Sequence, residues 1–397
     1  MEHLINITGK ALSGEWGYDD EEGVGIPVLR TTNFTNDGIV DFSNVITRTI
    51  KKKNIEEKYL RKGDIIIEKS GGSDNQPVGR VIYFDGEEKK YLFNNFTGLL
   101  RVKDTKIWFP KYVFYSLFAN YKKGGTKKYE NKTTGLHNLQ TDFYVKDFEI
   151  IDVQYSKQVE ICDALDKITD LIIKRKQQLK KLDMLVKSRF VEMFGDPVTN
   201  PYNLQTATLG ELSELITKGA SPSWQGFSYT DDSSQTLFIT SENVRDGYID
   251  LSSPKYIEDG FNERQKRSVI HDGDFLINIV GASIGRAAQF NLDCKANMNQ
   301  ASALVRINDN RICDKYLLIY LNSDKALMMY NLMKSETGRA NLSLQDIGNL
   351  EILLPSTDQQ IEFENLVKYV DKSKFEIKQS LEKLELLKKA LMQKYFG

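Results

Sequence analysis

The stretch KQQLKKLDMLVKSRFVEMFG occupies residues 176–195, and the chain repeats it as KQSLEKLELLKKALMQKYFG over residues 378–397. When the second copy is shifted by 202 residues, nine positions are identical. Apolar residues recur every three or four positions in and before each copy, which predicts a helix with one apolar seam. Gly195 and Gly397 follow the last predicted turns, and glycine in that place is a helix stop signal. We therefore expect two long helices.

The apolar seams of these helices predict that the helices pair with each other. Alternating spacings of three and four residues form the heptad pattern of a coiled coil. From residue 158 to residue 194 the first helix would be about 55 Å long. Antiparallel pairing is expected, because separate helices would leave long apolar stripes in water. The predicted helix interface contains Ile161, Leu165, Ile168, Ile172, Leu179, Leu182, Val186, Phe363, Val367, Val370, Ile377, Leu381 and Leu384.

The segments in front of the two helices are also copies of one another. At offsets between 202 and 210 residues, Gly79-Arg80 matches Gly285-Arg286 and Gln158 matches Gln360. Sequence between such landmarks differs widely, so the predicted fold class is α+β, with two tandem α/β units that share a scaffold and are related by an approximate two-fold axis. The predicted division is 1–156 for the first unit, 157–196 for the central helix, 197–356 for the second unit and 357–397 for the last helix.

Composition limits the classes to which the protein can belong. Of 397 residues, 40% are hydrophobic and 27% are charged, which is typical of a globular protein with more than one domain. No apolar run approaches the ~20 residues of a membrane span and no signal peptide is evident, so we expect a cytoplasmic protein without a membrane partner. The three cysteines and three histidines lack metal-ligand spacing, and no metal or cofactor is expected. The net charge of −1 requires any nucleic-acid contact to come from local patches.

One pattern has the composition of a catalytic site. Asp64 with residues 87–89, and Asp274 with residues 293–295, combine acids with a lysine as metal-dependent nucleases do. A charged hairpin turn over residues 85–90 is the simpler interpretation, because acid-x-lysine patterns are common by chance. The sequence also has no Walker loop or glycine-rich cofactor loop. We therefore expect no catalytic residues and keep a nuclease only as a minor alternative.

The order of globular unit, long helix, globular unit and long helix resembles the specificity subunit of type I restriction–modification systems. The Gly-Arg loops, the stretch GRANLS over residues 338–343, the helix start at residues 355–361 and the FGDP of residues 194–197 carry this resemblance over essentially the whole chain. It implies that the units are target recognition domains, each reading one half of a split double-stranded DNA sequence. It implies further that the helices set the gap and dock two adenine methyltransferase subunits, that restriction subunits with translocase activity join the complex, and that this chain is not catalytic.

Local basic and amide-rich segments are the candidate DNA contacts. Residues 120–140 have a net charge of +4 (5 − 1), which suits contacts to phosphates and base edges. Glycine lets the backbone approach a ligand and the following arginine can grip phosphate or guanine, although a structural salt bridge is the alternative for both Gly-Arg loops. Trp224 and Tyr229 are expected to pack in the core. The predicted DNA contacts are Arg80, Lys122, Lys123, Lys127, Lys128, Asn131, Lys132, Asn138, Arg286, Asn299, Gln300, Lys334, Arg339 and Asn341.

A protein-binding scaffold is the second hypothesis from the sequence. In that case both units bind proteins and the coiled coil only spaces them. The near-neutral net charge favours it mildly. DNA binding in the presence of a partner methyltransferase distinguishes the two hypotheses.

Overall fold

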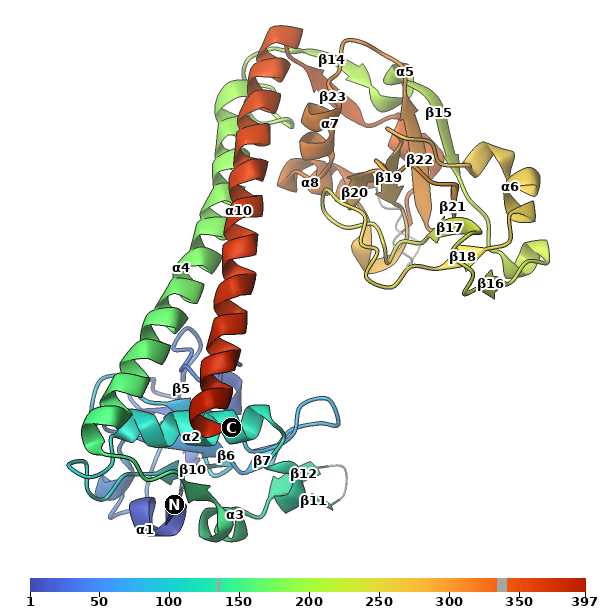
Figure 1. Cartoon of the computed structure of the whole chain (residues 1–397). Helices are drawn as coiled ribbons and strands as arrows, with labels where there is room; N and C mark the ends of the chain where they lie inside the picture. The colour runs from blue at the N-terminus through green and yellow to red at the C-terminus, as the bar shows by residue number, and fades with distance from the viewer. Residues whose placement is uncertain (134–135, 334–340) are drawn as a thin grey trace. The chain divides into compact units, whose positions relative to one another are not determined.

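The protein is described by a computed structural model that covers residues 1–133, 136–333 and 341–397. The chain forms two compact units: unit 1 contains Met1–Lys176 and Gln379–Gly397, and unit 2 contains Gln177–Lys378. Both units combine sheets with helices (Figure 1), as the α+β prediction requires. Each unit contains part of two 40-residue helices, α4 (Tyr155–Phe194) and α10 (Thr357–Phe396). In the described parts of the chain, no helix has both the length and the apolar character needed to cross a membrane.

Unit 1 is built on two four-stranded sheets and a three-stranded sheet. The first four-stranded sheet has the order β2 (Leu12–Ser13), β10 (Thr97–Leu100), β6 (Ile65–Glu68) and β8 (Val81–Tyr83). The second has the order β3 (Tyr18–Asp19), β5 (Ile46–Thr49), β4 (Ile26–Leu29) and β9 (Leu92–Phe93). The three-stranded sheet consists of β11 (Glu130–Thr133), β12 (Leu136–Leu139) and β7 (Ser70–Gly71), while β1 (Glu2–His3) pairs with β13 (Glu149–Ile150). Its helices are α1 (Leu4–Thr8), α2 (Pro110–Lys122), α3 (Thr141–Asp147) and the 3-10 helices η1 (Thr31–Asn33), η2 (Glu56–Lys58) and η3 (Lys127–Tyr129).

Unit 2 repeats the two four-stranded sheets in the same order along the chain. One consists of β15 (Ser213–Lys218), β22 (Ser302–Ile307), β19 (Phe275–Asn278) and β20 (Ala287–Gln289). The other consists of β16 (Tyr229–Thr230), β18 (Tyr256–Ile257), β17 (Thr236–Ile239) and β21 (Ala296–Met298), and β14 (Gln205–Thr208) pairs with β23 (Glu351–Leu354). Its helices are α5 (Leu209–Leu212), α6 (Gly260–Arg264), α7 (Asp314–Leu321), α8 (Asp324–Met333), α9 (Leu344–Gly348), η4 (Ser223–Gln225), η5 (Lys266–Ser268) and η6 (Gly281–Ser283). In both units one sheet contains a single parallel pair, β4 with β9 and β17 with β21.

The two long helices run antiparallel within each unit. In unit 2, Asp183 of α4 forms an ion pair with Lys374 (2.5 Å), and Arg189 lies 3.3 Å from Glu362, so later residues of α4 meet earlier residues of α10. In unit 1 an ion pair of 3.5 Å joins α4 to Glu385 of α10. Helix α4 ends where the sequence predicts, because Gly195 adopts φ +76° and its N–H donates to a carbonyl of the last turn.

The apolar seam is not equally buried along its length. Buried members are Ile161, Leu165, Ile168, Ile172, Val186, Phe363, Val367 and Val370. Half-buried members are Leu179, Leu182, Ile377, Leu381 and Leu384. Six of the buried members also belong to the core of their unit, where sheets and shorter helices cover them: Ile161, Leu165, Val186, Phe363, Val367 and Val370.

A buried ion pair occurs at the same place in both units. In unit 1, Asp64 accepts hydrogen bonds from Nε (2.7 Å) and Nη2 (2.6 Å) of Arg101. In unit 2, Asp274 accepts the same two bonds, each 2.7 Å long, from Arg306. Each aspartate also accepts the backbone N–H three residues before it, at 2.8 and 2.7 Å. In unit 1 the pair joins the start of β6 to the residue directly after the neighbouring strand β10. In unit 2 it joins the start of β19 to the neighbouring strand β22.

We expect Asp274→Ala to lower the free energy of unfolding of unit 2 by about 2–4 kcal/mol. The substitution leaves a largely buried guanidinium and a backbone N–H without their acceptor. Urea denaturation followed by hydrogen exchange of peptides from unit 2 measures the change. Asp293→Ala, at an exposed acid of the same unit, is the matched control and should have almost no effect. Equal stability of the two variants would contradict the structural role of the pair.

Candidate nucleic-acid interface

The two Gly-Arg loops require glycine for the same reason. Gly79 and Gly285 have φ of +105° and +87°, a region that other residues rarely adopt. A Cβ atom added at Gly79 would lie 2.7 Å from Thr126, and one added at Gly285 would lie 2.7 Å from the ring of Tyr330. Both loops therefore pass close against the body of their unit, and the arginine after each glycine starts from an equivalent place.

In unit 1 this arginine is held by the protein itself. Arg80 donates from Nε and Nη2 to the carboxylate of Glu68, over 3.0 and 2.8 Å, and only 1% of Glu68 is exposed. Arg80 also donates to the backbone carbonyls of Thr31 (3.2 Å) and Phe34 (3.4 Å). The hydrogen bonds to Glu68 raise the pKa of Arg80 above its ordinary value. The guanidinium of Arg80 is therefore committed to contacts inside unit 1, as the salt-bridge alternative predicts.

In unit 2 a buried amide makes the same carbonyl contacts. Asn278 stands where unit 1 has Glu68 (278 − 68 = 210) and is fully buried. Its Nδ2 donates to the carbonyls of Ser241 (2.9 Å) and Val244 (3.4 Å), which are the counterparts of the two carbonyls that Arg80 reaches. The two loop carbonyls are thus hydrogen-bonded without a buried charge and without an arginine.

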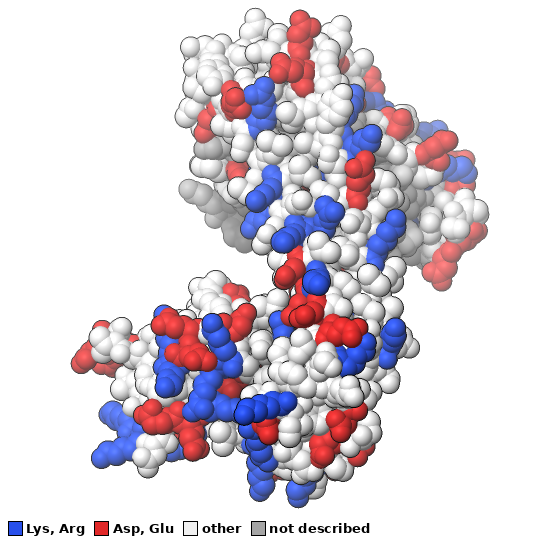
Figure 2. All heavy atoms as spheres, turned by 60° about the vertical axis from the view of Figure 1, so that its left-hand side comes forward, with Lys and Arg blue, Asp and Glu red and all other residues white. Residues whose placement is uncertain are grey.

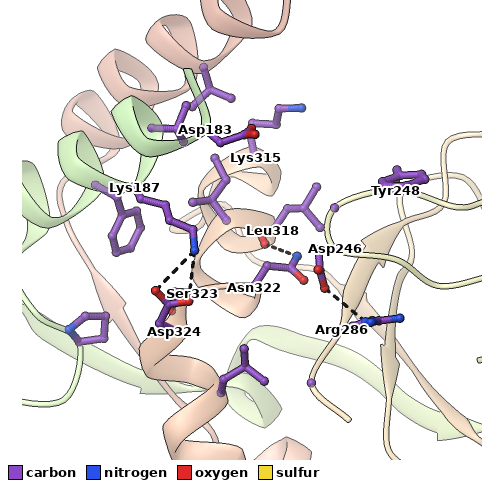
Figure 3. Close-up of a pocket in the computed structure, with 18 of the residues that line it drawn as sticks. Asp183, Lys187, Asp246, Tyr248, Arg286, Lys315, Leu318, Asn322, Ser323 and Asp324 are labelled. Atoms are coloured by element: carbon purple, nitrogen blue, oxygen red, sulfur yellow. Dashed lines mark hydrogen bonds and ion pairs between the residues drawn. The ribbon is translucent and has the colours of Figure 1, made fainter. Parts of the chain in front are cut away.

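Arg286 is consequently the more accessible of the two arginines. Its side chain is 39% exposed, and an acid near it, Asp246, lies 3.7 Å away and is itself 72% exposed. Figure 3 shows both residues at the edge of a cavity in unit 2, with Arg286 extending away from the helices. An exposed pair of this kind contributes little to stability, so Arg286 can exchange Asp246 for a phosphate or a base edge at small cost.

The three-stranded sheet of unit 1 carries a row of polar side chains. Asn131 of β11 lies opposite Asn138 of β12, which in turn lies opposite Ser70 of β7. Residues directly opposite each other in a sheet project from the same face. Asn131 is exposed and Asn138 is half-buried. The predicted contacts Asn131 and Asn138 are therefore neighbours on one surface.

The predicted lysines of unit 1 fall into two groups. Lys127 and Lys128 are exposed in η3, directly before β11, so they flank the polar row. Lys123 donates instead to the carbonyl of Phe396 (2.7 Å), and Lys122 lies 5.2 Å from a phenylalanine ring of α2, where burial lowers its pKa. These two face the end of α10. The backbone of Lys132 pairs within the hairpin, while its side chain lies outside the described residues.

Within the described residues, unit 2 keeps one pairing of this surface. Asn341 forms an isolated bridge with Val280, which corresponds to the pairing of Asn138 with Ser70. The predicted contacts Lys334 and Arg339 lie outside the described residues. Asn299 and Gln300 occupy the turn between β21 and β22, and Oδ1 of Asn299 accepts the backbone N–H of Ala301 (3.0 Å).

Three exposed aromatic residues lie outside the predicted DNA contacts. Phe96, in the turn of unit 1 that corresponds to Ala301, is 50% exposed, and its carbonyl accepts N–H bonds from Lys69 (2.8 Å) and Ser70 (3.1 Å). It therefore lies beside the polar row. Its place directly after Asn94-Asn95, which match Asn299-Gln300 at an offset of 205 residues, is the sequence signal that could have identified it. Trp224 is 89% exposed, so the expectation that it packs in the core is wrong. Tyr229 is 53% exposed and packs one edge on Phe238 (centroids 5.7 Å apart).

Each unit also has a cavity beside the long helices, at equivalent places. In unit 2 a cavity of about 920 Å³ is bounded by α4, α7, α8, α10 and the Gly-Arg loop, and Figure 3 shows Lys187 paired in it with Asp324 (3.1 Å). In unit 1 a cavity of about 710 Å³ is bounded by α2, α4 and α10. Lys388 stands there where unit 2 has Val186 (388 − 202 = 186), and burial lowers its pKa. The unit 1 cavity is therefore lined by lysine side chains together with apolar side chains.

Charge on the face of the molecule shown in Figure 2 is mixed rather than gathered. On the face shown in Figure 2, Lys and Arg side chains stand among Asp and Glu side chains, in keeping with the net charge of −1. Within the described residues, no group of three His, Cys, Asp or Glu side chains could hold a metal ion. Asp64 and Asp274, the acids that recur in the nuclease pattern, are occupied by the arginine pairs described above.

We expect Arg80→Ala to destabilise unit 1 by about 3 kcal/mol, because it leaves the carboxylate of Glu68 buried without a partner. Arg286→Ala should change the stability of unit 2 by less than about 0.5 kcal/mol, since it removes only an exposed pair. Adding Glu68→Asn to Arg80→Ala should recover part of the loss, because asparagine reproduces the arrangement of Asn278. Thermal unfolding and hydrogen exchange of each unit test this, and equal effects of the two arginine variants would refute it.

Comparisons with known proteins agree with this duplicated architecture. The chain matches the family model described as type I restriction modification DNA specificity domain over residues 3–183 and again over residues 201–386. It is 21% identical to the specificity subunit of the type I restriction enzyme EcoKI of Escherichia coli K12 in an alignment 401 positions long, which covers 94% of this chain and 82% of that subunit. It is 28% identical to the specificity subunit of the E. coli enzyme EcoBI over 158 residues, which is 39% of this chain and 33% of that subunit.

Solved structures share the fold over almost the whole chain. The S subunit of a type I restriction–modification system from M. genitalium has a TM-score of 0.56 at 15% identity and covers 100% of this chain and 95% of its own. A chain from a study of complex assembly and conformational transition of the type I system has a TM-score of 0.59 at 16% identity and covers 99% and 96%. Specificity subunits of this kind are non-catalytic recognition components. With both halves matched, the chain belongs to the family of type I restriction–modification DNA specificity domains.

Proposed function

We propose that this chain reads a two-part double-stranded DNA sequence, with one half read by each unit. Residues 1–156 and 197–356 would form the two target recognition domains, and residues 157–196 and 357–397 would form the helical spacer. The observation that carries the proposal is the shared buried framework, such as the Asp64–Arg101 and Asp274–Arg306 pairs, beneath surfaces that differ between the units. One scaffold with two different surfaces is what two unlike half-sites require.

The contacts to DNA would come from different residues in each unit. In unit 1 we propose the polar row of Asn131 and Asn138 with the adjacent Lys127 and Lys128, because amides can read adenine in the major groove and lysines can bind the flanking phosphates. In unit 2 we propose Arg286, whose accessible guanidinium suits a phosphate or guanine. Asn299, Gln300 and Asn341 remain candidates in the same unit.

The long helices would carry the partner subunits. Large apolar side chains are exposed along them, which favours protein contact. They include Leu171 (45%) and Leu386 (67%) in unit 1, and Met184 (57%), Tyr369 (75%) and Phe375 (60%) in unit 2. We propose that two adenine methyltransferase subunits dock there, and that restriction subunits join the resulting complex. The methyltransferases would supply the chemistry on flipped adenines.

The same exposed residues also support the second candidate, a protein-binding scaffold. That candidate differs in one measurable respect, because it requires no binding to DNA. Duplex DNA with random sequence, tested at low salt with the partner methyltransferase present, separates the two candidates.

Exchanging residues 1–156 for the corresponding segment of another family member should change only one half of the target. Each unit has its own core, so its surface can be replaced without altering the other unit. Mapping methylated adenines in DNA exposed to the complex identifies both halves before and after the exchange. A change in both halves would contradict one unit reading one half.

Changing Lys127 and Lys128 together to Ala should weaken DNA binding and lower the slope of log affinity against log salt concentration by about 2, since each phosphate contact accounts for about 0.9. Filter binding of the complex at several salt concentrations measures the slope. The matched control changes Lys106 and Lys146, which are also exposed lysines of unit 1. If both double variants behave alike, the segment at Lys127 has no special role.

A further inference from the structure

A buried glutamine lies in the first turn of each long helix. Gln158 is the fourth residue of α4 and is 1% exposed, and Gln360 is the fourth residue of α10 and is fully buried. The two correspond at an offset of 202 residues. Burial of an amide is costly unless its donors and its acceptor are satisfied, so the partners of these side chains indicate what the side chains do.

In unit 1 the amide of Gln158 joins three backbone groups. Its Oε1 accepts the N–H of Phe109 (2.8 Å), and its Nε2 donates to the carbonyls of Ile107 (3.0 Å) and Val153 (2.9 Å). Ile107 and Phe109 lie directly before α2, while Val153 lies between β13 and α4. One side chain therefore ties the first turn of the helix to two separate segments of its unit.

In unit 2 the amide of Gln360 makes the same three bonds. Its Oε1 accepts the N–H of Cys313 (2.8 Å), and its Nε2 donates to the carbonyls of Arg311 (2.8 Å) and Pro355 (2.9 Å). Arg311 and Cys313 lie directly before α7, and Pro355 lies between β23 and α10.

The repeated bonds do not depend on which residues provide the backbone groups. Cys313 replaces Phe109 and Pro355 replaces Val153, yet the amide keeps one accepted and two donated bonds. A glutamate could accept but could not donate at neutral pH, and leucine could do neither. Both units therefore need an amide at this position, although the surfaces of the two units have diverged.

We propose that Gln158 and Gln360 are positioning residues that fix the direction in which each long helix leaves its unit, and that they thereby set the gap between the two DNA half-sites. This inference rests on the proposed function. A helix of 40 residues is about 60 Å long, so a tilt of about 5° at its start moves its far end by about 5 Å. That displacement exceeds the ~3.4 Å rise of one base pair.

A rigid junction between each unit and its long helix makes DNA binding specific for one gap length for a second reason. One added base pair also turns a half-site by about 34° around the duplex, because the helix repeats about every 10.5 base pairs. A unit that is fastened to its helix by three hydrogen bonds cannot follow that turn without breaking them. A loosened unit can follow that turn. Duplexes with a gap one base pair longer or shorter are then bound almost as well as those with the native gap.

The test uses Gln158→Leu and Gln360→Leu in the full chain, purified with its methyltransferase partner. Leucine has a similar volume but forms no hydrogen bonds. Affinity is measured for duplexes that carry both half-sites of the wild-type complex, separated by the native gap or by one base pair more or fewer. We expect the preference for the native gap to fall about tenfold in each variant. The bases preferred within each half-site should stay the same.

Two control variants separate this role from a loss of stability. Gln379→Leu makes the same chemical change at an exposed position of α10, and Ile277→Val removes one methylene from the core of unit 2. Both should keep the native gap preference. Gln360→Glu places a carboxylate oxygen against the carbonyls of Arg311 and Pro355, so it should loosen the gap at least as much as Gln360→Leu. Gln158→Leu, in the other unit, keeps the test available if Gln360→Leu does not fold.

The outcomes distinguish a failure of the positioning role of the glutamines from a failure of the proposed function on which it rests. If the glutamine variants unfold at a lower temperature but keep the native gap preference, as Ile277→Val should, the glutamines serve only stability and the inference is wrong. If the wild-type complex does not distinguish split targets from random DNA, the proposed function itself fails.

Discussion

Phe194 and Phe396 end the two long helices in different cores, and the rest of the structure depends on that packing. The ring of Phe194 lies 4.9 Å from Tyr316 and 5.3 Å from Phe363, while Phe396 lies 5.3 Å from Tyr112. Burial of such aromatic surface is the main favourable contribution to folding. Because each core includes side chains from both helices, neither unit is complete without the pair of helices.

The divergence of the two units follows from how their buried polar groups are satisfied. The Asp–Arg pairs are kept in both units, since loss of one partner would leave a buried charge. The loop carbonyls beside the Gly-Arg turns are satisfied in two ways, by Arg80 with Glu68 and by Asn278 alone. In the second arrangement Arg286 is no longer needed for structure. Duplication thus allows a framework residue in one unit to become a surface residue in the other.

The sequence predicted the long helices and the duplicated units well, because heptad spacing and repetition are visible along the chain. It could not decide the role of Arg80, since that depends on Glu68, which only the pairing of β6 with β8 brings close. It placed Trp224 in the core because large aromatic residues usually pack, whereas a three-residue helix holds this one in solvent. The repeat also aligns Gln158 with Gln360, but the sequence does not reveal their backbone partners about 50 residues away.

Unit 1 is assembled from two separated parts of the chain, whereas unit 2 is one continuous segment. Residues 177–378 leave the ribosome before residues 379–397, which supply Leu391, Met392 and Phe396 to the packing of unit 1. Domains generally fold as units during synthesis, in the order in which they emerge. Here the amino-terminal core gains its last packing contacts only after translation has passed the whole of the second unit.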